Sequence, residues 1–361
     1  MFAPNPRGVG KALSSLFKHL VPLMPDSKIT FYTNRPGELR CGEAAQTRWI
    51  DIRGDRFNTW ENVRLPLASL TERINLLHCP SQTAPPLTPC PVVLTVHDLI
   101  PLRMDDGWSA VEVNRFRKAL TRSITKSRRI ITVSEFTKRD LMAFCRLSED
   151  KVDVVHWGVD KAPSSAFDED KWQSFCRRVG IVSPYFIAFG GDAPRKNVTG
   201  VLQALARFIR EVSRDVQLLL VGVPDEVKEK FKAAAGALDL SGSVVQLGYL
   251  PDELIRQALT RSEALVYPSL YEGFGLPILE AMVAGAPVIT SNVTSMPEIA
   301  GDAALLVDPV DPGAIADAMH ECFTNRSLRA ELKARAFRRI DDFSWELAAH
   351  QTLASYSKAL N

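Results

Sequence analysis

The chain has 361 residues, of which 46% are hydrophobic and 24% charged, with 20 glycines and 23 prolines. These proportions are those of a folded globular protein and exclude disordered, collagen-like and miniature disulfide-stapled proteins, while the length suits two domains of roughly 150 to 200 residues. With 44 Lys and Arg against 42 Asp and Glu, the net charge is +2. No overall field therefore attracts nucleic acid, and any anion site must be local.

Cysteine usage and hydropathy predict where the protein works. No apolar run reaches the roughly 18 to 20 residues of a membrane span, and the start at Met1 lacks the order of a secretory signal. The six cysteines have neither a C-x-x-C pair nor histidine partners at metal spacing, so we expect reduced, buried thiols; they are Cys41, Cys79, Cys90, Cys145, Cys176 and Cys322. A cytoplasmic protein is expected.

The first half of the chain alternates helical and strand-like segments. Apolar residues recur at helical spacing from Gly8 to about Val21, and further helices are predicted over Trp108–Ser127 and from Ser134 onward. Short apolar runs predict strands at Lys28–Thr33, Arg48–Ile52, Ile74–His78, Val92–Val96, Arg129–Val133 and Val152–His156. This alternation indicates a mostly parallel sheet covered on both faces.

A second alternating series follows Lys161–Asp170, which has the composition of a linker. Its predicted strands are Tyr185–Phe189, Val216–Gly222, Val244–Leu247, Ala264–Pro268, Pro287–Ser291 and Ala304–Val307. We therefore expect an α/β chain with two doubly wound, Rossmann-like domains, 1–165 and 171–342, and an active site in the cleft between them. The last helical segment, Phe343–Leu360, is able to pack on either domain.

The densest chemical signal is the segment from Tyr271 to Glu280, YEGFGLPILE, directly after a predicted strand. Pro277 suits the first turn of a helix and Gly285 the position just after its end, so the glycine loop opens a helix. Free amides at such a start favour a phosphate or a developing anion. Glu272 and Glu280 would repel a phosphate, so they are expected to bind hydroxyls of a sugar and a ribose; an ordinary tight turn is the alternative.

A second glycine turn, GGDAPRKN, begins at Gly190 and again separates a strand from a helix. Gly191, Arg195 and Lys196 combine a turn, a helix start and two cations, which together form a phosphate clamp. A solvated, charged loop is the alternative.

The third signal is His97 in TVHDL, at the carboxyl end of a predicted strand. An imidazole there is able to bond a sugar hydroxyl or exchange a proton, although a lone histidine is as often structural.

Three other patterns invite a different reading. Gly8-Val9-Gly10-Lys11 resembles part of a P-loop, but Ala12 stands where a magnesium-binding Ser or Thr is needed. Asp168-Glu169-Asp170 imitates an acidic metal motif, but it lies in the linker and is interpreted as a solvated helix start. The run of cations over 115–129 is interpreted as a solvated helix face, with peripheral contact to anionic lipid at the inner face of the cell membrane as the alternative.

In combination, these segments make the chain resemble the retaining glycosyltransferases of family 4, which have the two-domain GT-B fold. TVHDLIPL, ITVSEFTKRDL, VVHWGVD, PRKN, EGFGLPILEAM and FSWELAAHQTL are most similar to bacterial mannosyltransferases of exopolysaccharide and O-antigen assembly. The resemblance covers nearly the whole chain. It implies transfer of a hexose, with GDP-mannose as the expected donor and UDP- and dTDP-sugars as alternatives, to a saccharide or polyprenyl-diphosphate-linked acceptor, without a metal or other cofactor.

The resemblance also implies roles for individual residues. His97, Glu272 and Lys196 correspond to the catalytic positions, at the donor sugar and its diphosphate, and Glu280 to the ribose contact. The remaining donor-binding positions are Gly8, Gly10, Gly190, Gly191, Arg195, Gly273, Phe274, Gly275 and Leu276. By the same likeness, the last helix crosses back to the first domain.

Two departures from the family pattern remain. Gly191 stands where the family has an arginine, so either Arg195 substitutes or the clamp is weaker. The chain also lacks a strand before Gly8, which means that the sequence is truncated or misstarted, or that a central strand is missing and its neighbours' edges are exposed. A catalytically silent sugar-nucleotide binder or assembly subunit is therefore the alternative to an enzyme, while a nucleotide-sugar epimerase fits the EGFG pattern poorly.

Overall fold

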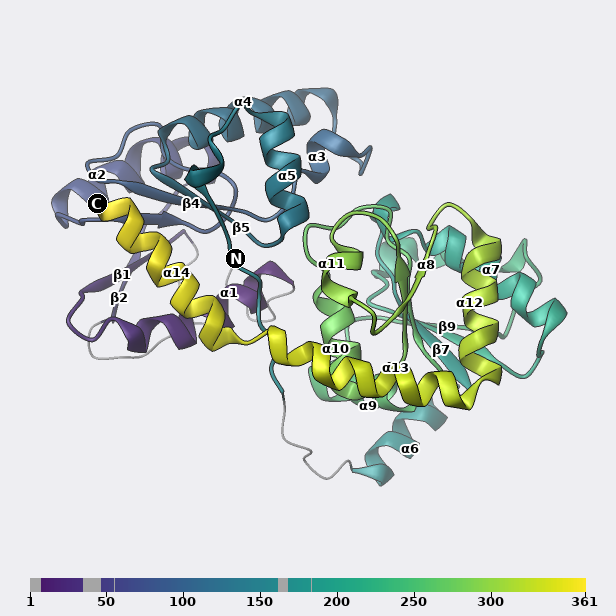
Figure 1. The fold of residues 1–361 in the computed structure, drawn as a ribbon. Coiled ribbons are helices and arrows are strands. Elements are labelled where there is room, and N and C mark those ends of the chain that lie inside the picture. Colours follow the sequence, from purple (N-terminus) through teal and green to yellow (C-terminus); the bar gives the residue numbers. More distant parts are fainter. Residues whose placement is uncertain (1–7, 35–46, 55, 162–167, 183) are drawn as a thin grey trace. The chain divides into compact units, whose positions relative to one another are not determined.

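The computed structural model describes residues 8–34, 47–54, 56–161, 168–182 and 184–361 (Figure 1). These residues form two compact units. Unit 1 is built from the described residues of Met1–Arg103, Trp108–Gly158 and Phe343–Asn361, and unit 2 from those of Met104–Gly107 and Val159–Asp342. Residues 162–167 of the predicted linker lie outside the described residues.

Unit 1 contains two parallel sheets. β1 (Ile29–Thr33) pairs with β2 (Thr47–Asp51), and β3 (Leu77–Cys79), β4 (Val92–Val96), β5 (Arg129–Thr132) and β6 (Val152–Val154) form the second sheet in that order. The helical segments are α1 (Val9–Leu20), η1 (Val21–Leu23), η2 (Arg56–Arg64), α2 (Leu65–Thr71), α3 (Ile100–Arg103), α4 (Ala110–Lys126), α5 (Glu135–Phe144), η3 (Glu149–Lys151) and α14 (Trp345–Leu360).

Local sequence explains several of these boundaries. Ser109 and Glu112 form a capping box that starts α4, and the Ser134 hydroxyl accepts the Thr137 amide at the start of α5. The core of the unit joins strand residues such as Leu94 and Ile130 to Leu120 of α4.

Helix α14 belongs to unit 1 and packs on α1 and β5 (Figure 1). Ser355 and Lys358 of α14 both donate to the carboxylate of Asp153 on β6, at 2.6 and 2.7 Å, and Arg129 of β5 donates to the same carboxylate at 2.6 Å. Close packing also requires Gly158, since a Cβ there would lie 2.3 Å from the amide nitrogen of Trp345.

Unit 2 has one continuous parallel sheet with the order β12-β11-β10-β7-β8-β9. Its strands are β7 (Tyr185–Phe189), β8 (Gln217–Val221), β9 (Val244–Leu247), β10 (Leu265–Tyr267), β11 (Val288–Ser291) and β12 (Leu305–Val307). Its helical segments are α6 (Glu169–Val179), η4 (Pro194–Lys196), α7 (Val198–Glu211), η5 (Asp225–Val227), α8 (Lys228–Gly236), α9 (Asp252–Arg261), α10 (Leu276–Ala284), α11 (Met296–Ala300), α12 (Pro312–Thr324), α13 (Arg326–Arg339) and η6 (Ile340–Asp342).

The four inner strands of unit 2, β11, β10, β7 and β8, are buried on both faces, which explains their nearly continuous apolar sequences. Leu218, Leu219 and Leu220 of β8 are all fully buried. On one face, Phe186 of β7 packs edge-on against Phe208 of α7, with ring centroids 5.4 Å apart, and α7 packs on α12 (Figure 1).

The structure confirms the α/β class and the parallel sheets, and the predicted strands agree with the observed ones to within a few residues. One boundary was wrong: the run predicted from Ile74 forms a strand only from Leu77, after a turn. Asp168 caps α6, as its interpretation as a helix start requires.

The cysteine prediction was wrong in part. Cys79, Cys176 and Cys322 are buried free thiols, whereas Cys90 and Cys145 are only half-buried. Cys41 lies outside the described residues. Within the part of the chain that the structure describes, no helix is both long and apolar enough to cross a membrane.

Candidate functional site

Two loops at the carboxyl ends of neighbouring strands meet in unit 2. Residues 190–197 follow β7 and residues 268–275 follow β10, and the two strands pair directly in the sheet. The Leu270 amide donates to the Arg195 carbonyl at 2.8 Å, and the Asn197 side-chain amide donates to the Pro268 carbonyl at 3.1 Å. The fold therefore brings the two predicted glycine motifs together.

At this junction, one carboxylate oxygen receives several donors. Oε1 of Glu272 lies 2.7 Å from Nζ of Lys196 and 3.2 Å from Nη1 of Arg195. The hydroxyl of Tyr267, the last residue of β10, donates to the same oxygen at 2.9 Å. Lys196 also donates to the Tyr267 hydroxyl at 2.7 Å, so the three side chains form a closed triangle.

Burial and charge set the protonation of this cluster. The side chains of Glu272 and Lys196 are only 14% and 18% exposed. Burial by itself raises the pKa of Glu272, but the charges of Lys196 and Arg195 outweigh it and hold the pKa below its usual range. Burial likewise lowers the pKa of Lys196, and the neighbouring Tyr267 and Glu272 raise it overall. Both groups are therefore charged at neutral pH.

The cations keep donors beyond those that Glu272 uses. An ammonium has three N–H groups and a guanidinium five. Lys196 spends two on Tyr267 and Glu272, and Arg195 pairs with Glu272 and, through Nε at 3.2 Å, with Asp106 of the same unit. The pair is thus able to hold an added anion without releasing the carboxylate.

The start of α10 adjoins the cluster. Gly275 is the N-cap, with a φ of 120° that disfavours any side chain, and a Cβ there would lie 3.0 Å from Cε of Met296. Pro277 occupies the first turn, as the sequence predicts. The amides at this helix start, beside Lys196 and Arg195, offer N–H donors to an anion.

The sequence analysis did not identify the hydroxyl groups that bond to backbone carbonyls of residues 267–274 and so support the loop after β10. The hydroxyl oxygen of buried Ser295 lies 2.9 and 2.8 Å from the carbonyl oxygens of Glu272 and Phe274, so its single proton is shared between the two acceptors. Thr290 and Ser291 of β11 donate to the carbonyls of Tyr267 and Ser269. The sequence offered one signal: Thr290 and Ser291 are polar residues at the end of an otherwise apolar strand, where a buried hydroxyl needs a hydrogen-bond partner.

The remaining predicted residues of unit 2 have different surroundings. Glu280 is half-buried within α10. Gly190 is needed for packing, since a Cβ there would lie 2.8 Å from Cγ2 of Val223, while Gly191 has a φ of 154° and open space around it. Gly273, Phe274 and Leu276 lie in or next to the loop, with the first two buried.

The predicted site residues of unit 1 are His97, Gly8 and Gly10. His97 follows β4, but its ring is only 4% exposed, its Nε2 donates to the Pro80 carbonyl at 2.7 Å, and it packs on Trp157 with ring centroids 5.2 Å apart. Gly8 has a φ of 44° and caps α1. Gly10 lies buried inside α1, within the segment for which helical periodicity is predicted.

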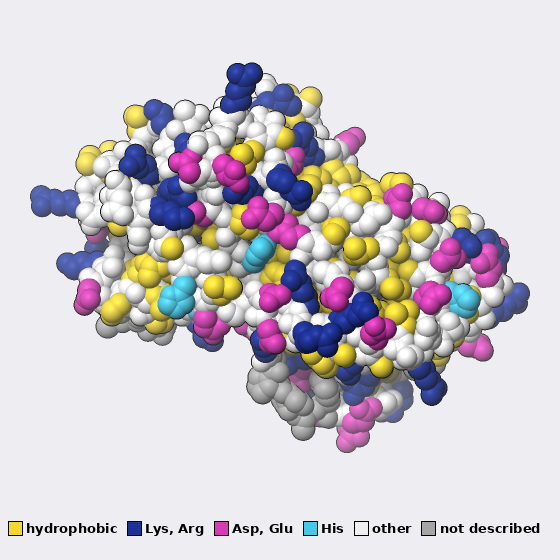
Figure 2. Space-filling view, in the orientation of Figure 1, with side chains coloured by type: hydrophobic (Ala, Val, Ile, Leu, Met, Phe, Trp, Pro, Cys, Tyr) yellow, Lys and Arg dark blue, Asp and Glu magenta, His cyan; other side chains and the backbone are white. Residues whose placement is uncertain are grey.

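The cationic residues of the segment 115–129 do not all lie on one helix face. Its residues up to Lys126 lie on α4, but Arg129 is on β5 and is largely buried against Asp153. Elsewhere on the face shown in Figure 2, cationic and anionic side chains are interspersed, in keeping with the small net charge.

Two Rossmann-like units, one with a cation-rich glycine loop pair at the carboxyl ends of its central strands, define the GT-B class of glycosyltransferases. Family models agree: residues 8–162 match "Glycosyltransferase Family 4" and residues 182–339 match "Glycosyl transferases group 1". The chain belongs to glycosyltransferase family 4, as its sequence motifs predict.

The chain is also similar to individual proteins, two by sequence and two by fold. The chain is 30% identical over 274 residues to O-antigen chain mannosyltransferase B of Escherichia coli, covering 73% of this chain and 69% of that protein. It is 32% identical to the MMP alpha-(1->4)-mannosyltransferase of Mycolicibacterium hassiacum, covering 75% and 66%. A glycosyltransferase from Rickettsia africae shares the fold with a TM-score of 0.76 at 17% identity, over 99% of this chain and 97% of that one. WaaG, a glycosyltransferase involved in lipopolysaccharide biosynthesis, does so with 0.74 at 15%, over 98% and 97%.

Proposed function

We propose that the protein transfers mannose from GDP-mannose to a saccharide or lipid-linked oligosaccharide of a cell-surface polysaccharide, with retention at the anomeric carbon. The observation that carries this proposal is the paired-cation cluster of Lys196, Arg195 and Glu272 beside the start of α10. The choice of mannose draws support from relatives that are mannosyltransferases.

In this proposal the cations and the helix start stabilise the leaving diphosphate. Negative charge grows on the β-phosphate as the glycosidic bond breaks, and fixed donors aimed at it lower the barrier. Lys196 and Arg195 supply the spare N–H groups described above, and the amides of Gly275 and Leu276 supply the helix end. Because these groups neutralise the developing charge, we propose that no metal ion is required.

Glu272 has the features of a sugar contact rather than a nucleophile. Its Oε1 is held by the protein, which leaves Oε2 to accept sugar hydroxyls, and two adjacent cations stabilise its charge and so reduce its reactivity. We propose that the acceptor oxygen bonds to the anomeric carbon on the face from which the diphosphate leaves, and that its proton passes to the departing phosphate. Glu280 binds the ribose in the same scheme.

In unit 1, we propose that His97 contacts the donor sugar, and that Gly8 and Gly10 lie near the phosphates. Because Nε2 of His97 is committed to Pro80, such a contact would use Nδ1 or the backbone. Peripheral lipid contact is proposed through α4, where Val111 is 78% exposed and the adjoining Trp108 44% exposed.

The decisive test is nucleotide release from GDP-mannose with an acceptor saccharide and excess EDTA present. We expect release by the unaltered chain and a loss of about a hundredfold or more in Glu272→Gln. The matched control is Glu263→Gln, because Glu263 is also half-buried, pairs with Arg329 at 3.4 Å, and lies just before the same strand that Glu272 follows. A panel with UDP- and dTDP-sugars identifies the donor, and absence of release with every donor contradicts the enzyme proposal.

The alternative, a silent sugar-nucleotide binder or assembly subunit, is favoured by one observation: the two sheets of unit 1 are not joined among the described residues. A binder would show a raised melting temperature with GDP-mannose but no acceptor-dependent release. Thermal shift and release measured on the same sample therefore separate the two functions.

A further inference from the structure

The hydroxyl of Tyr267 lies between two charged groups of the site in unit 2. It is 2.7 Å from Nζ of Lys196 and 2.9 Å from Oε1 of Glu272. An ammonium has no lone pair with which to accept a hydrogen bond, so the phenol oxygen accepts from Lys196 and its single proton is left for Glu272. The direction of both hydrogen bonds is therefore fixed, and the hydroxyl acts on both charged groups at once.

The tyrosine itself is held from several sides. It ends β10 and is only 3% exposed. Phe189 of β7 packs edge-on against its ring, with ring centroids 6.5 Å apart, and the Thr290 hydroxyl of β11 donates to its carbonyl at 2.9 Å. Lys196, by contrast, reaches the cluster on a flexible four-carbon chain. Because the tyrosine is the fixed partner of this pair, it determines where the ammonium lies.

Two anchored hydrogen bonds determine the direction of the third N–H of Lys196. Its Nζ lies 2.7 Å from both the Tyr267 hydroxyl and Oε1 of Glu272, and 4.8 Å from the centre of the Tyr267 ring. The three N–H groups of an ammonium are arranged tetrahedrally, so once two are committed the third has one direction. Without the hydroxyl, Glu272 would be the single acceptor in this triangle, and the ammonium would be free to rotate about that one bond.

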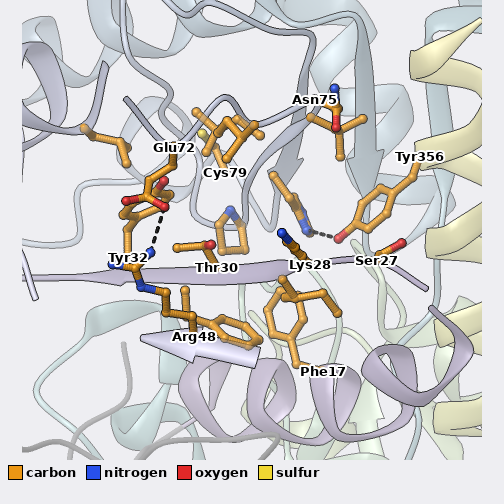
Figure 3. Close-up of a pocket in the computed structure, with 18 of the residues that line it drawn as sticks. Phe17, Ser27, Lys28, Thr30, Tyr32, Arg48, Glu72, Asn75, Cys79 and Tyr356 are labelled. Atoms are coloured by element: carbon orange, nitrogen blue, oxygen red, sulfur yellow. Dashed lines mark hydrogen bonds and ion pairs between the residues drawn. The ribbon is translucent and has the colours of Figure 1, made fainter. Parts of the chain in front are cut away.

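Two other buried tyrosines use their hydroxyls differently. The Tyr185 hydroxyl donates to the Ala258 carbonyl at 2.9 Å, and that of Tyr356 lies 2.6 Å from Nδ1 of His78 beside a cavity in unit 1 (Figure 3). Burial lowers the pKa of His78 to about 3, so its ring is neutral at pH 7. Of these three hydroxyls, that of Tyr267 is the one that bonds to charged side chains.

We propose that Tyr267 is a positioning residue of the transfer reaction: its hydroxyl, itself held by Glu272, directs the remaining N–H of Lys196 towards the leaving diphosphate. This inference rests on the proposed function, in which Lys196 stabilises that diphosphate. A misdirected N–H matters most when negative charge has developed on the phosphate. The hydroxyl therefore contributes to the turnover rate more than to donor binding.

The kinetic test is acceptor-dependent nucleotide release by Tyr267→Phe, which removes the hydroxyl and keeps the ring that packs on Phe189. We expect kcat to fall about tenfold or more, as for the loss of one hydrogen bond to a charged group, with the donor KM within about twofold. Tyr185→Phe is the matched control, because Tyr185 is equally buried and begins β7, whereas Lys196 follows the other end of that strand. The control should leave kcat unchanged.

A double-mutant cycle separates positioning from packing. If the hydroxyl acts through Lys196, then Tyr267→Phe should cost less than about twofold in a Lys196→Met chain, where no ammonium remains to be directed. A purely structural role would give the same loss in both backgrounds. Equal losses in the two backgrounds, a Tyr267→Phe kcat within about twofold of the unaltered chain, or an equal loss in Tyr185→Phe would each overturn the proposal.

A spectroscopic measurement makes the test independent of catalysis. The ammonium protons are followed by proton–nitrogen correlation spectra of lysine side chains, and the Lys196 signal is assigned by its loss in Lys196→Met. In Tyr267→Phe we expect these protons to exchange faster with water, while Tyr185→Phe matches the unaltered chain. An unchanged Lys196 signal in Tyr267→Phe would overturn the positioning role. Absence of release by the unaltered chain with every donor would instead contradict the proposed function, and the Lys196 signal would still decide whether Tyr267 directs the ammonium.

Discussion

Units 1 and 2 are both built from parallel sheets and helices, but among the described residues the strands of unit 2 form one sheet and those of unit 1 form two. In unit 2, six strands pair without a break, and hydroxyls from β11 and the Ser295 turn fix the loops that carry Lys196 and Glu272. In unit 1, a cavity of about 1140 Å³ separates β1 from β3, and α1 and α14 border it. Strands that are paired on both sides hold the loops that follow them in place, so the loops after β7 and β10 have firmer support than segments beside the cavity of unit 1.

The sharpest way to test this contrast is to remove one phenyl ring from each unit. Phe208 is 1% exposed and packs on Phe186 and Phe323, so Phe208→Ala should cost about 3 to 5 kcal/mol of unfolding free energy. Phe17 already borders the cavity, so Phe17→Ala removes fewer contacts and should cost less than half as much. Urea unfolding, with amide exchange in β4 and β8 to assign each transition, measures both; equal costs would contradict the contrast.

A second prediction concerns the cluster of unit 2. Lys196→Met keeps the length of the side chain but removes its charge, and we expect transfer to fall by roughly a hundred- to a thousandfold because a donor to the leaving diphosphate is lost. The exposed Lys171, which pairs with Asp168, provides the control: Lys171→Met should leave the rate unchanged. Acceptor-dependent nucleotide release gives the readout, and a Lys196→Met rate within threefold of the unaltered chain would remove this lysine from the mechanism.

Acid should weaken unit 1 through His78. Burial lowers the pKa of this histidine to about 3, and its ring nitrogens lie 2.6 Å from the Tyr356 hydroxyl and 2.7 Å from that of Thr95. Since the unfolded chain takes up this proton near pH 6.5 and the folded one does not, stability is complete above pH 6.5 and falls by about 1.4 kcal/mol per pH unit towards pH 3.

The pH effect is measured as the change in urea midpoint between pH 7.0 and pH 5.5, followed in β4. His78→Gln should flatten the dependence, whereas replacement of the exposed His320 in unit 2 by Gln should not. An unchanged slope in His78→Gln would show that another group carries the acid sensitivity.

Most of the fold was predictable because its strands are short, apolar and separated by strong turn signals. Val92–Val96, Tyr185–Phe189 and Val244–Leu247 are strands with the predicted bounds. Periodicity does not report which strands pair, so the separation of β1 and β2 from the sheet of β3 to β6 among the described residues required coordinates.

The site was predictable at the level of loops but not of partners. The sequence places Lys196 and Glu272 after different strands, and the adjacency of β7 and β10 in the sheet makes them neighbours. It gave no sign that they would pair with each other, or that Tyr267 would join them, because such contacts depend on side-chain directions. His97 lies after β4, as its predicted place at a strand end requires, but the sequence did not indicate that its ring would pack on Trp157.

The smallest expected effect tests whether the loop of unit 2 is held by its hydroxyl support. Ser295→Ala removes one hydrogen bond to the carbonyls of Glu272 and Phe274, worth about 1 kcal/mol, or roughly fivefold in transfer rate. Ser295→Thr retains the hydroxyl and should recover most of the activity, while Ser262→Ala, which loses a comparable bond to the Leu259 carbonyl at the end of α9, should have no effect. If the loss appears in kcat with the donor KM unchanged, Ser295 positions the loop for the transition state; a loss of thermal stability alone, with full activity at low temperature, would reduce its role to folding.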